Sequence, residues 1–145
     1  MVSTFTGPAI YTDSEKYKKV DFSDIANEKA KFQKQADNGW LAMVQHYFVA
    51  AWVPQEKVMR EFYMRKLAGS DTFQAGVIIP VNEIAPGKTE TTKVDLYAGP
   101  QEQAALEKVA TGLELVVDYG WLTVVAAPIF WALEAIYKLV GNWGW

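Results

Sequence analysis

Cysteine is absent from the 145 residues, and His46 is the only histidine. Without cysteine the chain cannot form disulfides, thiolate nucleophiles or cysteine-ligated metal sites. No second histidine is available to help complete a metal site or a nucleophilic triad around His46. We therefore predict no catalytic residue, no metal site and no cofactor site, and we expect that the protein is not an enzyme.

Other signals of function are lacking as well. The glycines are isolated and form neither a phosphate-binding loop nor a dinucleotide fingerprint. The net charge of −3 is spread along the chain, and no Lys/Arg-rich stretch is interleaved with aromatics, which argues against nucleic acid as a partner. The N-terminus has neither the basic stretch nor the apolar run of a signal peptide. We interpret the charged run 15–19 as a solvated face and His46 as a structural histidine.

What the chain has in abundance is apolar side chains. They make up 50% of the residues, and 14% of the residues are aromatic, which predicts a folded domain with a real core. The apolar character rises markedly after Tyr119. The C-terminal end is therefore expected to meet a different solvent from the rest.

Most of the chain predicts short antiparallel strands separated by turns, as in a mainly β antiparallel sandwich. Gly7 and Pro8 interrupt the first strand, Asn38-Gly39 and Pro86-Gly87 mark turns, and 61–67 pairs with 72–79 as a hairpin. A helix is expected at about 101–111, between Pro100 and Gly112. The expected strands are 2–12, one or two buried strands within 40–53, 61–67, 72–79, 93–98 and 113–117.

The segment 121–140 predicts a hydrophobic helix, with Asp118 as its N-terminal cap. Its plainly polar residues are Thr123, Glu134 and Lys138, which project to one side at about 100° per residue. Roughly twenty residues could span a bilayer. However, Pro128 interrupts the segment, and each buried charge costs about 2.5–3.5 kcal/mol on insertion.

A helix lying in the membrane interface avoids both problems, because its polar side faces water and its wide apolar face enters the acyl region. Tryptophans at 121, 131, 143 and 145 suit that depth. From the residues alone, a buried core helix and a true membrane span remain alternatives to this amphipathic, membrane-interfacial helix.

Several short motifs occur along the chain in a recognisable order and spacing. They are FTGPA at 5–9, EKY at 15–17, GWLAM at 39–43, AWVP at 51–54, YAGP at 97–100, VDYGWL at 117–122 and VGNWG at 140–144. Together they resemble the second half of the large periplasmic domain of Gram-negative YidC membrane protein insertases, over essentially the whole chain.

This resemblance implies an organisation in three parts on the periplasmic side of the bacterial inner membrane. Residues 1–118 would form a portion of a periplasmic β-supersandwich, and 119–140 an amphipathic interfacial helix. Residues 141–145 would begin a truncated transmembrane helix. The family's anchor helix, the first part of its sandwich and its core transmembrane helices have no counterpart in these residues, so we expect insertion itself to be carried out by a longer parent protein.

The family inserts and folds inner-membrane proteins, alone or with the Sec translocon. The resemblance implies that this portion is a docking and membrane-surface scaffold. Its implied partners are inner-membrane lipid, Sec components of the SecD/SecF type and, through the parent, nascent membrane-protein clients. We predict that the membrane-interface residues are Trp121, Leu122, Phe130, Trp131, Leu133, Trp143 and Trp145.

Two other hypotheses compete with this one. A free-standing β-sandwich binding module, with carbohydrate as its candidate ligand, would use exposed aromatics such as Trp52, Tyr63 or Tyr97. A sugar-mutarotating enzyme of similar fold would need histidine and carboxylate partners in a cleft, which His46 alone does not supply.

Overall fold

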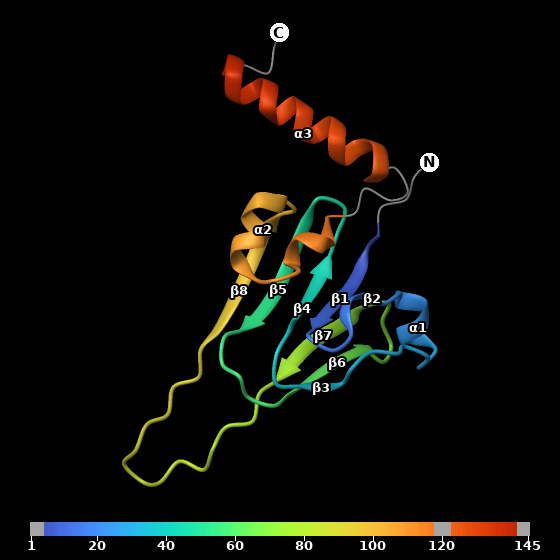
Figure 1. Ribbon diagram of the computed structural model, residues 1–145. Coiled ribbons are helices and arrows are strands. Elements are labelled where there is room, and N and C mark those ends of the chain that lie inside the picture. The colour runs from blue at the N-terminus through green and yellow to red at the C-terminus, as the bar shows by residue number, and fades with distance from the viewer. Residues whose placement is uncertain (1–4, 118–122, 142–145) are drawn as a thin grey trace. The chain divides into compact units, whose positions relative to one another are not determined.

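Two antiparallel sheets form the N-terminal part of the protein (Figure 1). The computed structural model describes residues 5–117 and 123–141. The chain divides into two compact units, of which residues 5–117 are one, here called the β-unit, and the C-terminal helix belongs to the other. The five-stranded sheet has the order β2-β1-β4-β5-β8, and its strands are β1 Gly7–Thr12, β2 Lys16–Lys19, β4 Trp40–Val44, β5 Phe48–Pro54 and β8 Val94–Pro100.

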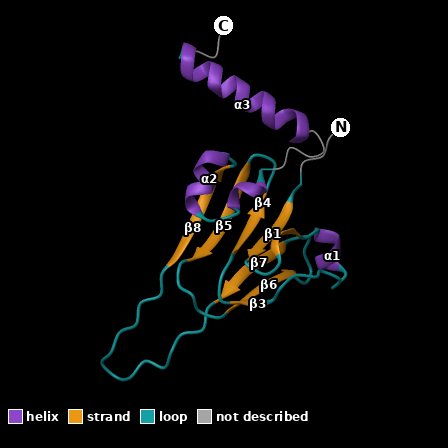
Figure 2. Cartoon of the chain, in the orientation of Figure 1, coloured by secondary structure: helices purple, strands orange, loops and turns teal. Residues whose placement is uncertain are grey.

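The three-stranded sheet has the order β3-β6-β7 and packs on one face of the larger sheet. Its strands are β3 Gln35–Ala36, β6 Arg60–Lys66 and β7 Phe73–Ile78. All pairings among the described strands are antiparallel, which confirms the predicted mainly β sandwich with helices towards the C-terminus (Figure 2). Three short helices complete the β-unit: α1 Phe22–Ala26, α2 Gln103–Val109 and the 3-10 helix η1 Leu113–Val116.

The larger sheet has a separate core on each face, because side chains alternate along its strands. One face of β1, β4 and β5 packs against Leu106 of α2 and against Leu113 and Val116 of η1. The other face of β1 and β4 presents Ile10 and Leu41 to Phe62 of the smaller sheet. The sandwich is therefore closed over β1 and β4 by the second sheet, and over the opposite face by helices.

Trp40 links the larger sheet to the helices α2 and η1, here called the helical cover. Its side chain is buried, its Nε1–H donates to the carbonyl of Thr111 at 2.9 Å, and its ring stacks on Tyr11 at 5.9 Å between centroids. Gly112 follows with φ of 80°, and a Cβ there would lie 2.5 Å from Cε2 of Tyr11. Only glycine can turn the chain at this point without displacing the ring.

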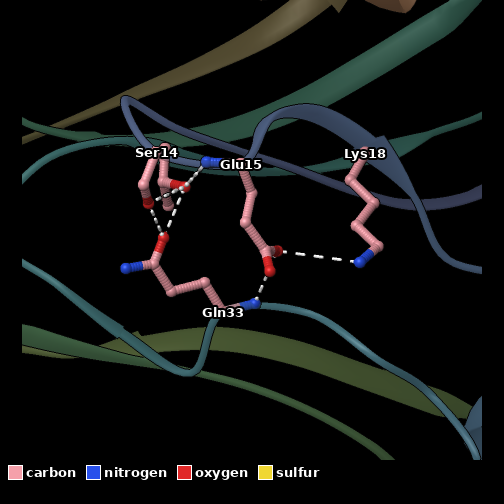
Figure 3. A network of polar contacts seen from close by, with 5 residues as sticks. Ser14, Glu15, Lys18 and Gln33 are labelled. Carbon is pink, nitrogen blue, oxygen red and sulfur yellow. Dashed lines mark hydrogen bonds and ion pairs between the residues drawn. The ribbon is translucent and has the colours of Figure 1, made fainter.

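A network of polar contacts ties the β1–β2 turn to the segment before β3 (Figure 3). The hydroxyls of Thr12 and Ser14 both donate to Oε1 of Gln33, the former at 2.7 Å. The backbone N–H of Gln33 in turn donates to Oε2 of Glu15 at 3.0 Å, and Lys18 lies 3.7 Å from the same oxygen. Most of the run 15–19, which was predicted only as a solvated face, forms the edge strand β2. Lysines on an edge strand discourage pairing with another chain.

The predicted strand at 113–117 was wrong, because η1 occupies this segment. Leu113 and Val116 are three residues apart and both buried, which is the spacing of one face of a 3-10 helix. Most of the other predicted elements are confirmed within a few residues: 40–53 holds two strands, 61–67 and 72–79 form the hairpin β6–β7, and α2 covers 103–109. In the predicted strand 2–12, the described strand β1 begins at Gly7, and Gly7 and Pro8 pair with Val44 and Met43 instead of interrupting it. Strands β2 and β3 and helix α1 were not predicted.

The connection 79–93 between β7 and β8 is long and exposed. At its tip the N–H of Lys88 donates to the carbonyl of Ala85 at 3.0 Å, and Gly87 has φ of 78°. This confirms the turn predicted at Pro86-Gly87. Val81 and Ile84 are exposed on its first half.

Helix α3, Thr123–Val140, forms the described part of the second unit. It confirms the predicted helix over these residues, whereas the proposed cap at Asp118 lies outside the described part of the chain. Within the described ranges, no helix has the length and the apolarity that crossing a membrane requires.

Candidate functional site

Among the residues that the structure describes, the largest group of exposed apolar side chains in one element lies on α3. Trp131 is 71% exposed and Ile136 is 55% exposed, although both are large hydrophobic residues. A helix with this much uncovered apolar surface is expected to have a partner or an apolar solvent. Among the described side chains of α3, the exposed large hydrophobic residues are Ile129, Phe130, Trp131, Leu133, Ile136, Tyr137 and Val140.

A short polar side interrupts this surface. Glu134 and Lys138 stand one turn apart, with Lys138 Nζ 3.4 Å from Glu134 Oε1. They are the only charged residues between positions 123 and 141. Spacing of i,i+4 with the acid first is the favourable orientation on a helix, and such a pair contributes about 0.3–0.5 kcal/mol.

The helical repeat separates the exposed apolar residues into two groups. At about 100° per residue, Ile136 and Ile129 project about 140–160° from Glu134 around the helix axis, and Leu133 and Val140 about 100–120°. Phe130, Trp131 and Tyr137 lie within about 60° of Glu134 and border the polar side. We call Ile129, Leu133, Ile136 and Val140 the apolar face, and Phe130, Trp131 and Tyr137 the aromatic border.

Three of the seven predicted membrane-interface residues are described, and all three lie on the exposed apolar surface of α3. Leu133 lies on the apolar face, whereas Phe130 and Trp131 belong to the aromatic border. Ile129, Ile136 and Val140 were not predicted, although the same helical repeat identifies them once Glu134 and Lys138 mark the polar side. The remaining predicted residues, Trp121, Leu122, Trp143 and Trp145, lie outside the described residues.

A second uncovered apolar surface lies on the β-unit, where the smaller sheet does not reach β5 and β8. The register places Leu41, Trp52 and Leu96 in one cross-strand row on the same face. Leu41 is 1% exposed under the smaller sheet, but Trp52 is 42% and Leu96 54% exposed. Phe48 and Ala98 line a neighbouring hollow of about 370 Å³ on β5 and β8. We call this surface the β5–β8 face.

The aromatics named for a carbohydrate site are not brought together. Trp52 and Tyr97 lie on opposite faces, because Tyr97 pairs with Ala51 and packs towards the helical cover. Tyr63 belongs to the smaller sheet, where its hydroxyl accepts from Gln74 Nε2 at 3.1 Å. The three side chains therefore form no common platform for a sugar.

No metal centre is found among the described residues. Their carboxylates and His46 contain no cluster of three groups able to hold a metal ion. His46 is exposed in the turn between β4 and β5, where its ring meets Tyr47 edge-on at 4.2 Å. A hollow of about 850 Å³ lies between the α1–β3 segment and the β6–β7 hairpin, and its Lys66 is paired with Asp71 at 2.9 Å.

Known proteins similar to this chain include several membrane protein insertases. A family model described as the YidC periplasmic domain matches residues 1–132. A membrane protein insertase YidC of Dechloromonas aromatica (strain RCB) is 74% identical over 145 residues, which is 100% of this chain and 26% of that protein. The YidC insertases of Aromatoleum aromaticum and Thiobacillus denitrificans are 61% and 58% identical over 99% and 98% of this chain, again 26% of each relative. The chain therefore spans about a quarter of the length of these relatives.

Proposed function

Because the chain belongs to the family of YidC periplasmic domains, we propose that it is the docking and membrane-surface scaffold of a membrane protein insertase. In this proposal the parent protein inserts and folds inner-membrane proteins, alone or with the Sec translocon. The β-unit lies on the periplasmic side of the inner membrane, and α3 rests on the lipid surface. The segment itself carries out no catalytic step.

The observation that carries this proposal is the distribution of side chains on α3. An apolar face opposite one compact polar side is the pattern of a helix lying in the plane of a membrane interface. The aromatic border supports it, because tryptophan and tyrosine favour the depth between acyl chains and water. Phe130, Trp131 and Leu133 would then contact lipid or the parent's transmembrane helices, together with Ile129, Ile136 and Val140.

The β5–β8 face supports the docking role. The row through Trp52 and Leu96 leaves large apolar side chains in water, and such patches typically mark protein contacts. We propose Sec components of the SecD/SecF type as partners of the β-unit. Nascent membrane-protein clients are reached through the parent protein rather than through this segment alone.

The double substitution Leu133→Gln/Ile136→Gln tests the membrane role of α3. Glutamine keeps a high helix propensity, so the helix should persist while two apolar side chains are lost. Each loss of a lipid-buried aliphatic side chain removes about 1.5 kcal/mol or more, so binding should fall about 100-fold or further. Flotation of the 145-residue chain with phospholipid vesicles measures this binding.

The matched control is Val81→Gln/Ile84→Gln in the exposed connection 79–93. It removes two similarly exposed apolar side chains from the β-unit. Vesicle binding of this control should equal that of the unsubstituted chain. The proposal would be refuted if the unsubstituted chain fails to float, or if the α3 variant floats as well as the control does.

A further inference from the structure

Helix α3 has a polar side with no net charge. Between positions 123 and 141 the sequence has one acid and one base, and the structure pairs them at 3.4 Å. Helices that recognise anionic membranes carry a surplus of Lys and Arg on the polar face. Each such residue near an anionic surface contributes about 1 kcal/mol. In α3 the attraction of Lys138 to an anionic surface is offset by the repulsion of Glu134.

The β-unit does not supply the missing positive charge. Its stretch richest in lysine, residues 13–34, contains six basic and five acidic residues. Four of these lysines line one hollow, but Asp24 and Glu28 line it as well. The whole chain has a net charge of −3. The net charge of the chain therefore provides no overall electrostatic attraction to an anionic bilayer.

Glu134 and Lys138 instead match a headgroup that carries both charges. Their side chains are 46% and 73% exposed, so the pair is open to solvent and exchanges readily with other ions. The carboxylate can form an ion pair with a headgroup ammonium, and the Lys138 ammonium can donate to a headgroup phosphate. A zwitterionic phospholipid offers both groups at the depth that the aromatic border would occupy.

We infer that α3 recognises a zwitterionic phospholipid surface, on which apolar burial rather than electrostatic attraction drives binding. This inference rests on the proposed membrane role of α3 and deepens it by naming the class of lipid. Two consequences follow. Adding anionic lipid should not tighten binding, and raising the salt concentration should not weaken it.

The experiment compares flotation with phosphatidylcholine vesicles and with vesicles in which part of this lipid is replaced by phosphatidylglycerol. The unsubstituted chain should bind the anionic vesicles no more tightly than the zwitterionic ones, at low and at high salt. Glu134→Gln leaves the helix with a net positive charge and should raise binding to anionic vesicles about fivefold. Lys138→Gln should lower it about fivefold. Both substitutions should change binding to pure phosphatidylcholine little.

The possible failures are distinguishable. If the unsubstituted chain binds phosphatidylglycerol-containing vesicles several-fold more tightly and salt reverses this gain, the inference on lipid class is overturned while the membrane role stands. The same holds if neither single substitution changes the preference between the two kinds of vesicle. If the chain binds neither kind, the proposed membrane role fails, and the inference fails with it.

Discussion

Replacing Arg60 by methionine is expected to lower the free energy of unfolding of the β-unit by about 3–5 kcal/mol. Arg60 is 2% exposed, and its five guanidinium N–H groups donate to five backbone carbonyls. Methionine would fill the space but leave these carbonyls without their donors. The acceptors are the carbonyls of Asp37, Gly39, Pro54, Glu56 and Val58.

The position of these carbonyls explains the size of the effect. Those of residues 37 and 39 lie before β4, and those of residues 54, 56 and 58 lie at the end of β5 and in the connection to β6. Arg60 therefore joins two connections between the sheets. Desolvation lowers the pKa of Arg60, and the charges of Asp37 and Glu56 act in the opposite direction. Because the ordinary pKa of arginine lies far above neutrality, the side chain still carries its charge.

A second variant separates the charge of Arg60 from the shape of its guanidinium, and a third serves as a control. Arg60→Lys keeps the charge but offers three donors from one atom, so it should lose roughly half as much stability. Arg65→Met is the control, since Arg65 lies on the same strand but is exposed, donates only to Gln74 Oε1 at 2.9–3.0 Å and lies over the Tyr63 ring at 5.6 Å. Its cost should stay within about 0.5 kcal/mol. Denaturant unfolding measures all three, and equal midpoints for Arg60→Met and Arg65→Met would contradict this role.

The strands could be predicted from the sequence because their side chains alternate between core and solvent. Val49, Ala51 and Val53 are buried on β5, and the residues between them point the other way. The hairpin β6–β7 was found from its turn at 68–71. The helix α3 was found because Glu134 and Lys138 are the only charges in a long apolar segment. Each of these signals is local.

The missed features depend on contacts between distant parts of the chain. β2 is polar, and pairing with β1 and a tertiary contact of Tyr17 with Trp40, 6.1 Å between ring centroids, hold it in place. The 3-10 helix η1 places Leu113 and Val116 on one face, so that both side chains pack against the larger sheet. The sequence gives no sign that Arg60 is buried, because its hydrogen-bond acceptors are backbone carbonyls contributed by other segments.

The β5–β8 face was also beyond the reach of sequence patterns. Trp40 and Trp52 both occupy apolar, strand-forming segments, and neither their composition nor their periodicity distinguishes a covered tryptophan from an uncovered one. The face of the sheet decides the difference. Trp40 packs against α2 and η1 on one face, whereas Trp52 lies on the other face, where the smaller sheet covers β4 and ends before β5. These two tryptophans therefore offer a matched comparison.

Replacing Trp40 by alanine should lower the free energy of unfolding by about 3–5 kcal/mol. The substitution empties a buried site, removes the stack on Tyr11 and leaves the Thr111 carbonyl without the Nε1–H donor. Trp40→Phe keeps most of the apolar volume and should cost about 1–2 kcal/mol, mainly through that hydrogen bond. Denaturant unfolding followed by far-ultraviolet circular dichroism measures both without depending on tryptophan fluorescence.

Trp52→Ala is the comparison, and it should cost about 1 kcal/mol or less in the isolated chain, because the side chain is 42% exposed and belongs to neither core. A cost as large as that of Trp40→Ala would mean that the β5–β8 face is covered in the folded chain, which would contradict its docking role. A small cost would mean that the β5–β8 face is uncovered in the folded chain. A large exposed tryptophan that the β-unit does not need for its own stability remains available to a partner, so Trp52→Ala should then weaken association of the β-unit with its partner while the fold persists.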